Sequence, residues 1–221
     1  MRQVITALFA AFLCVFISSS VFAQTNQARY GGDFLSTGGG ARALGMGSAH
    51  VAFTNDVSAA YWNVAGLASV SDPQILYMHS ERFDGIVGYD YAAAALPLQS
   101  GKGVLALTFI RQGVDNIPNT LNAFDQDRNQ PRENAEDFIT RFSTADVAFF
   151  LSYATQRSER LSIGATAKVI NQTLGPFAEA WGYSLDIGAQ YRTGFADFGI
   201  SVRDITTLQK MWTIDEDEFA S

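Results

Sequence analysis

The glycine-rich run from Gly38 to Ala43, GGGARA, is the part of the sequence whose residue spacing most directly suggests chemistry. It satisfies the G-x-G-x-x-A pattern of a dinucleotide-binding turn, and Asp56 falls near the distance expected of a ribose-binding carboxylate. That pattern binds phosphates only when a buried strand leads into it and a helix leads out. The preceding residues 28–37, ARYGGDFLST, contain no apolar run long enough for such a strand. We therefore expect no nucleotide cofactor, and the run needs another role.

Residue types that catalyse reactions or bind metals are few and scattered. His79 and Ser80 are adjacent, and adjacent residues of a strand point to opposite faces, which is poor geometry for proton transfer between them. The acidic run at 215–218, DEDE, lacks the spacing of a calcium-binding loop. The only cysteine, Cys14, lies in a segment that we expect to be removed. The sequence therefore predicts a protein that is not an enzyme, with no catalytic residue, metal site or cofactor.

The first 23 residues have the composition of a secretory signal peptide. Arg2 is followed by the largely apolar residues 4–17, then by three serines and by Val-Phe-Ala at 21–23. These are the charged start, apolar middle and small-residue cleavage site of such peptides. An apolar run of this length is too short to span a bilayer as a helix. We expect export of the chain and removal of the signal peptide, residues 1–23.

The charge balance of the chain is acidic. It has 15 Lys and Arg against 22 Asp and Glu, which gives a formal net charge of −7, and no basic cluster offsets it. Such a chain repels the phosphates of nucleic acid, so we expect no nucleic-acid partner. After the signal peptide no apolar run is long enough for a membrane helix, whereas membrane strands give a much weaker sequence signal.

Alternation of apolar and polar residues predicts seven strands. Between residues 161 and 169 the odd-numbered positions are apolar and the even-numbered positions are small, polar or charged, which is the period of a strand. The pattern, strong or weak, predicts strands at 74–80, 87–96, 103–111, 147–155, 161–171, 183–191 and 195–203. Their polar faces would line a lumen, and the candidate lumen-facing residues on them are Asp90, Lys168 and Asp186.

The connections between these strands favour a membrane barrel over a soluble sandwich. Every second connection is short, at 98–102, 156–160 and 192–194, and the long polar span 112–143 falls in the other set. Outer-membrane barrels show this asymmetry, with short periplasmic turns and longer external loops. We therefore predict an all-β fold, a transmembrane antiparallel β-barrel in the cell outer membrane, with its strands in residues 74–221 and outer-membrane lipid around it. A soluble secreted β-sandwich that acts as a binding module is an alternative.

Residues 24–73, which precede the first predicted strand, are expected to form an N-terminal arm and plug. Their segment 38–68 does not alternate; Asn55 or Asp56 can cap a short helix, and Gly66 suits the position after its end. A segment rich in glycine and alanine with one small helix can pack closely against the inner wall of a barrel. We therefore predict that it is a plug, with an exposed periplasmic arm as the alternative.

Residues 40–68, GARALGMGSAHVAFTNDVSAAYWNVAGLA, resemble the N-terminal signature of the PorV/PorQ family of outer-membrane proteins. These proteins are relatives of the FadL-type fatty-acid channels, whose hatch contains a similar YWNPAGL element. Val64 stands where that element has proline. Without proline this position has no fixed φ angle and regains an N–H donor. The resemblance and the predicted plug give the following candidate plug and interaction residues: Arg42, Gly45, Met46, Gly47, Asn55, Asp56, Tyr61, Trp62, Asn63 and Gly66.

The resemblance implies a barrel of about fourteen strands that carries an N-terminal plug. PorV-like members serve the type IX secretion system and bring exported proteins to a surface attachment complex, so exported cargo proteins and other secretion components would be partners. FadL-like members instead pass hydrophobic compounds across the outer membrane, and this channel function is the alternative. Seven strands are too few to close a barrel, and residues 212–221 show no strand pattern. We therefore expect the chain to be the N-terminal portion of a longer protein. A complete eight-stranded barrel with one unrecognised strand is the alternative.

Overall fold

A computed structural model describes residues 32–125, 128–205 and 209–215. The predicted signal peptide at residues 1–23 lies outside the described residues, as do residues 24–31 of the predicted arm. The described chain is mostly antiparallel β-sheet with a few short helical turns, so the prediction of an all-β fold is confirmed. In these ranges we find no helix with the length and apolar character needed to cross a membrane.

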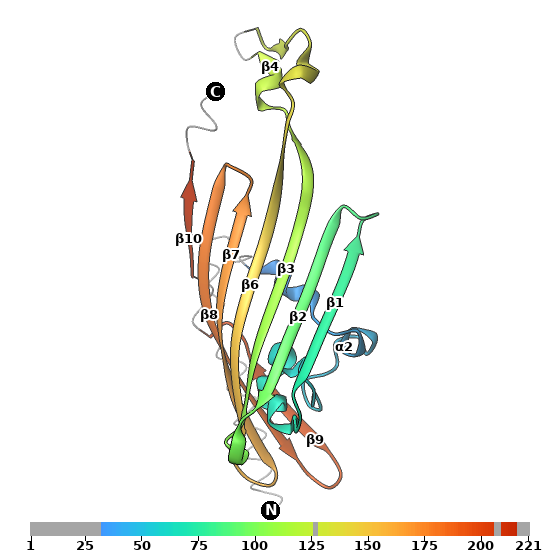
Figure 1. The fold of residues 1–221 in the computed structure, drawn as a ribbon, viewed down its shortest axis with the longest axis vertical. Coiled ribbons are helices and arrows are strands. Elements are labelled where there is room, and N and C mark those ends of the chain that lie inside the picture. The colour runs from blue at the N-terminus through green and yellow to red at the C-terminus, as the bar shows by residue number, and fades with distance from the viewer. Residues whose placement is uncertain (1–31, 126–127, 206–208, 216–221) are drawn as a thin grey trace, which may run out of the picture. The chain divides into compact units, whose positions relative to one another are not determined.

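One curled antiparallel sheet dominates the described residues (Figure 1). Its strands pair in the order β1-β2-β3-β6-β7-β8, so that neighbours along the main path are also neighbours in the sheet. The strands are β1 (Gln74–Arg82), β2 (Val87–Pro97), β3 (Val104–Asn119), β6 (Thr140–Gln156), β7 (Leu161–Leu174), β8 (Ala178–Arg192), β9 (Asp197–Val202) and β10 (Gln209–Ile214). Each of the seven predicted strands is present, because alternation is a local property of a half-buried strand.

Strand β10 was not predicted, and it shares the edge of the sheet with β9. β9 pairs with the last residues of β8, and β10 pairs with its first residues. The interpretation of residues 212–221 as free of strand structure is therefore wrong for residues 212–214. The run before the acidic residues is too short to show a period, and it becomes a strand because β8 offers unpaired backbone groups at that edge.

One long connection distinguishes the two ends of the sheet. The short turns 98–103, 157–160 and 193–196 lie at one end. The long link 120–139 lies at the other end, at the top of Figure 1, together with the short turns 83–86 and 175–177. The long span predicted at 112–143 is thus shorter, because its flanks extend β3 and β6 as paired strand. The link itself contains η4 (Leu121–Ala123), β4 (Phe124–Asp125), β5 (Gln130–Pro131) and η5 (Ala135–Phe138), and η3 (Gln99–Gly101) lies in the turn between β2 and β3.

The N-terminal segment, residues 32–70, packs against one face of the sheet, here called the inner face. It contains η1 (Asp33–Thr37), α2 (Ala41–Gly45), α3 (Ala59–Trp62) and η2 (Val64–Ser69). The single helix predicted after Asp56 is two pieces, because Asn63 is extended with φ −158° and ψ 104°. Gly66 lies inside η2 and does not follow the end of a helix, so that part of the prediction is wrong.

The two faces of the sheet differ in chemistry. The inner face buries aromatic side chains such as Tyr89, Tyr91 and Phe150 together with polar ones such as Lys168 and Gln190. The opposite face, here called the outer face, exposes large apolar side chains over β3 to β9. They are Leu105, Leu107, Phe149, Leu151, Tyr153, Ile163, Val169, Tyr183, Leu185, Ile187, Tyr191, Phe198, Ile200 and Val202.

Candidate functional site

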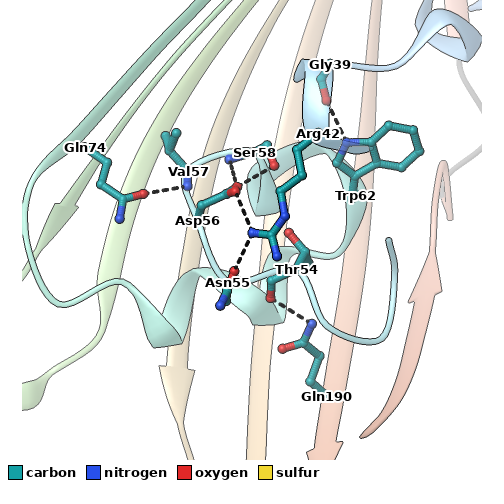
Figure 2. Close-up of polar contacts among 10 residues, drawn as sticks. All are labelled: Gly39, Arg42, Thr54, Asn55, Asp56, Val57, Ser58, Trp62, Gln74 and Gln190. Carbon is teal, nitrogen blue, oxygen red and sulfur yellow. Dashed lines mark hydrogen bonds and ion pairs between the residues drawn. The ribbon is translucent and has the colours of Figure 1, made fainter. Parts of the chain in front are cut away.

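The glycine run that suggested a nucleotide site is a close-packing element. Gly38 and Gly40 both have φ of 86°, a conformation that side chains rarely adopt. A Cβ atom on Gly39 would lie 2.3 Å from the ring of Tyr91. The carbonyls of the run accept hydrogen bonds from Tyr89 Oη (3.0 Å, to Gly38) and from Trp62 Nε1 (2.7 Å, to Gly39; Figure 2). The run therefore lets the chain pass directly over two tyrosines of β2.

A network around Asp56 orders the turn that leads into α3. Asp56 Oδ1 accepts a hydrogen bond from the Ser58 backbone N–H at 2.9 Å. The N-cap residue of α3 is Ser58, so Asp56 orders the preceding turn and the expectation that Asn55 or Asp56 caps the helix is wrong. Arg42 reaches Asn55 at 3.3 Å and Asp56 at 3.7 Å (Figure 2). These three predicted residues come together, and their contacts are partly exposed, so they order the surface of the segment.

Asn63 ties the N-terminal segment to the sheet. Its Nδ2 donates to the carbonyls of Val51 (2.9 Å) and of Ala189 on β8 (3.1 Å), and its Oδ1 accepts from the Ala65 N–H (3.2 Å). The side chain is buried. Because a buried amide needs partners for its donors and its acceptor, this arrangement fixes the position of the turn against β8.

Glycines on the inner face of the sheet make room for that turn. Gly164 of β7 and Gly188 of β8 are direct register partners. A Cβ atom on Gly188 would lie 2.2 Å from Asn63 Oδ1, and one on Gly164 would lie 3.0 Å from the carbonyl carbon of Val64. A Cβ on Gly199 of β9 would lie 2.4 Å from the Val51 carbonyl oxygen. The backbone of the segment thus rests on a track of glycines across three strands.

Sequence reasoning missed this glycine track. By alternation Gly164 and Gly188 fall on the polar faces of their strands, and nothing local marks them as a docking surface. A usable signal exists in the sequence, since both glycines fall on the same predicted face of neighbouring strands. Gly66 shows the same principle, because a Cβ there would lie 2.4 Å from the Thr54 carbonyl oxygen.

Lys168 forms the centre of a buried ionic cluster on the inner face. Its Nζ lies 2.7 Å from Asp186 Oδ2 and 3.2 Å from Asp204 Oδ1, and the Lys168 and Asp186 side chains are 3% and 8% exposed. The same nitrogen lies 5.1 Å from the centroid of the Phe150 ring. The structure therefore brings together two of the three residues predicted to share a polar face, Lys168 and Asp186, and adds Asp204, which was not predicted.

Asp204 reaches this cluster because the edge of the sheet is interrupted beside it. β9 ends at Val202, opposite Ile187, and β10 begins at Gln209, opposite Tyr183, so a bulge-like break interrupts the pairing along this edge of β8. Asp204 has a φ of 54° and donates its backbone N–H to Asp186 Oδ1 at 2.9 Å. Such bulges redirect side chains, and here the bulge turns a carboxylate onto the inner face.

The same bulge directs Arg203 onto the N-terminal segment. Its guanidinium carbon lies 4.9 Å from the centroid of the Tyr61 ring and 5.7 Å from that of Trp62. Its NH2 group lies 3.4 Å from the Trp62 carbonyl oxygen. Tyr61 donates its hydroxyl to the Leu35 carbonyl, and burial raises the pKa of its phenol. Tyr61 and Trp62, both predicted plug residues, are thus the aromatic contacts of this arginine.

Asp90 does not share the face of Lys168 and Asp186, so that prediction is wrong. It lies on the outer face, where its Oδ1 is 2.8 Å from both Tyr77 Oη and His79 Nδ1, and its Oδ2 is 3.9 Å from Arg111. The neighbouring tyrosines of β2 take the inner face instead, because the N-terminal segment covers this strand and buries their rings.

Three predicted interaction residues lie apart from these contacts. Gly45 ends α2 and Met46 and Gly47 follow it on an exposed stretch, and a Cβ on either glycine would meet no atom within 4 Å. His50, which was not predicted, is completely buried nearby and lies edge-on to Phe53 with 4.9 Å between ring centroids. Burial lowers the pKa of this histidine, and neither ring nitrogen has a hydrogen-bond partner among the described residues.

The arrangement is that of a docked segment locked in place by buried polar contacts. Backbone hydrogen bonds, a glycine track and an ionic cluster hold residues 32–70 against the inner face, and apolar side chains cover the outer face. Comparison with known proteins gave no match to any family model, curated protein or solved structure.

Proposed function

We propose that this chain is an outer-membrane β-barrel protein of the PorV/PorQ type, with the N-terminal segment as its plug. In this role it serves type IX protein secretion and the surface attachment of exported proteins. Its partners are outer-membrane lipid, exported cargo proteins and other secretion components. The secretion role rests on the resemblance of residues 40–68 to that family, and the membrane location rests on the outer face of the sheet.

The apolar outer face is the observation that carries the membrane proposal. Leu107, Leu151, Ala167 and Leu185 are successive register partners across β3, β6, β7 and β8. The three leucines are 64%, 56% and 47% exposed. Soluble monomers rarely expose contiguous apolar patches of more than a few hundred Å², whereas a strand in a membrane turns apolar residues to lipid at every second position.

The height of this apolar band suits a bilayer. On β8 the outward positions from Trp181 to Tyr191 begin with two aromatic residues, continue with aliphatic ones and end with a tyrosine. At about 3.3 Å per residue, Trp181 and Tyr191 are about 33 Å apart along the strand. A tilt of about 45° reduces this length to about 23 Å across the membrane. Outer-membrane barrels have an apolar band of about 25 Å flanked by aromatic girdles.

The inner face supports the assignment of the N-terminal segment as a plug. The segment covers inner-face positions near the short turns, through Gln190 and Arg192 of β8, which bond to Thr54 and Ser69 (3.1 and 2.8 Å). Short turns face the periplasm in barrels of this kind. The plug would therefore close the periplasmic side and leave the long link 120–139 on the cell surface.

The membrane proposal is tested by placing a charge on the outer face. Leu185→Arg should reduce the inserted fraction or its stability, because an arginine facing lipid near the midplane costs about 2–4 kcal/mol. Leu121→Arg is the matched control, since that leucine is exposed on the long link outside the apolar band. Recovery of the native protein in the soluble periplasmic fraction, or equal insertion of both variants, would contradict the proposal.

The secretion role is tested separately by deleting the gene. Loss of surface attachment of many exported proteins, restored by the intact gene, is the result expected. A strain that attaches its surface proteins normally and fails only to take up hydrophobic compounds would replace this role by the channel function.

A further inference from the structure

A small cavity lies between the N-terminal segment and the inner face, beside the bulge of the edge strand. Its volume is about 180 Å³, which corresponds to about six water molecules. Leu35 and Tyr61 line it from the segment, Phe150 and Lys168 from the sheet, and Arg203 and Asp204 from the bulge. The cavity therefore joins apolar and charged walls, as pockets for small molecules do.

Arg203 gives the cavity a cation that has no carboxylate partner. Within the described residues no ion pair includes its guanidinium, which lies over the Tyr61 and Trp62 rings and contacts the Tyr61 hydroxyl and the Trp62 carbonyl oxygen. A guanidinium has five N–H donors in a planar fork that matches a carboxylate. One wall of the cavity thus offers an unused site for a carboxylate.

The Lys168 cluster gives the cavity a negative charge, opposite in sign to that of Arg203. One ammonium there faces the two carboxylates of Asp186 and Asp204, so the cluster carries a surplus negative charge. Asp186 is buried, whereas the Asp204 side chain is 44% exposed and lines the cavity. In the described chain no ion pair joins Asp204 to Arg203, so the two charges stay separate.

We propose that this cavity binds a small zwitterion of the α-amino-acid class with an apolar side chain. The ligand carboxylate pairs with Arg203, and its ammonium pairs with Asp204. Its side chain packs against Leu35, Tyr61 and Phe150. A ligand with only one charge would satisfy one wall and leave the other unpaired. This proposal does not depend on the membrane location or the secretion role, and its failure would leave both standing.

The ligand preference is tested by calorimetric titration of the purified full chain with leucine, isocaproate and isoamylamine. Isocaproate is leucine without its ammonium group, and isoamylamine is leucine without its carboxylate. Leucine should bind saturably and both analogues at least tenfold more weakly, because each analogue loses one charge-assisted contact. Failure of leucine to bind, or an analogue that binds as tightly as leucine, would overturn the proposal.

Two variants, each with a matched control, test whether Arg203 binds the ligand carboxylate and Asp204 its ammonium. Arg203→Gln should weaken leucine binding at least tenfold and remove the preference over isoamylamine. Its control is Arg82→Gln, since Arg82 also lies over a tyrosine ring (Tyr89, 5.4 Å) and bonds to the N-terminal segment (Thr37, 3.1 Å) but does not line the cavity.

Asp204→Asn should remove the preference for leucine over isocaproate, and asparagine tolerates the positive φ of this position. Its control is Asp84→Asn, because Asp84 has a similar φ of 57° outside the cavity. Equal losses in a variant and its control would show that the variant acts through the fold, and the contact assigned to that residue would be wrong. If a variant fails to fold, the three titrations of the unchanged protein still decide the proposal.

Discussion

Replacing Gly188 by alanine should release the N-terminal segment from the sheet. The added Cβ would lie 2.2 Å from Asn63 Oδ1, a contact that a real structure does not tolerate, and the atom that it meets belongs to a buried side chain. Asn63 must then move and give up its bonds to Val51, Ala65 and Ala189. Gly88→Ala is the matched control, because a Cβ on that strand glycine would meet no atom within 4 Å.

The size of the effect follows from the three hydrogen bonds of Asn63. Each bond has a net contribution of about 0.5–1.5 kcal/mol, so their joint loss should lower the free energy of local opening by about 2–4 kcal/mol. At about 1.4 kcal/mol per factor of ten, amide exchange in the segment should accelerate roughly 30-fold to 700-fold. The sheet should keep its protection, because its backbone hydrogen bonds run between strands and do not involve Asn63.

Native-state hydrogen exchange read by mass spectrometry measures this directly. Peptides that cover residues 51–66 report the segment, and peptides that cover 104–119 report β3 in the sheet. Unchanged exchange in 51–66 would show that Gly188 does not hold the segment. An equal acceleration in both regions, or the same effect in Gly88→Ala, would show that the substitution weakens the whole sheet and would refute the reasoning.

Three further changes test the same site. Lys168→Met leaves the buried carboxylate of Asp186 without its ion-pair partner and should destabilise the fold by about 3–5 kcal/mol in denaturant unfolding. Burial holds the pKa of His50 below its usual value of about 6.5, so the neutral ring is favoured in the folded state. Stability of the segment should be complete above about pH 6.5 and fall as the pH drops from there toward the folded pKa. Exchange in residues 51–66, corrected for its intrinsic pH dependence, checks this, and His50→Phe should remove the effect. Replacing both Tyr61 and Trp62 by alanine should open the segment and leave exchange in the sheet unchanged; equal loss in both would make the segment an integral part of the wall.

Local patterns in the sequence determine that the sheet exists and where most of its strands lie. Side chains of a strand point alternately to two faces, so a half-buried strand such as residues 161–171 shows its period without knowledge of its neighbours. The same period places Lys168 and Gly164 on one face of their strand. Side-chain hydrogen bonds within a turn are also local, which is why Asp56 orders the turn before α3 although the helix itself begins after Ser58.

Alternation alone does not tell which of the two rows of alternate side chains on a strand faces inward. On β2 one row contains Tyr89 and Tyr91 and the other contains Asp90, and the pattern favours an outward position for the aromatic row. The N-terminal segment reverses this choice, because its glycine run lies against the tyrosine rings and buries them. Asp90 is then left on the outer face. What packs against a strand decides its orientation, and that partner is far away in the sequence.

The candidate site depends still more on tertiary structure. Arg203 and Asp204 reach the inner face because the edge strand is interrupted, and that interruption is defined only by the pairing of β9 and β10 with β8. Glycines 164, 188 and 199 show their role only when another backbone lies over them. Local period and side-chain size are enough to specify the strands and the small-residue segment that packs on them. The contacts between segment and sheet form only in the folded chain, because hydrogen bonds, ion pairs and steric contacts there join residues that are far apart in the sequence.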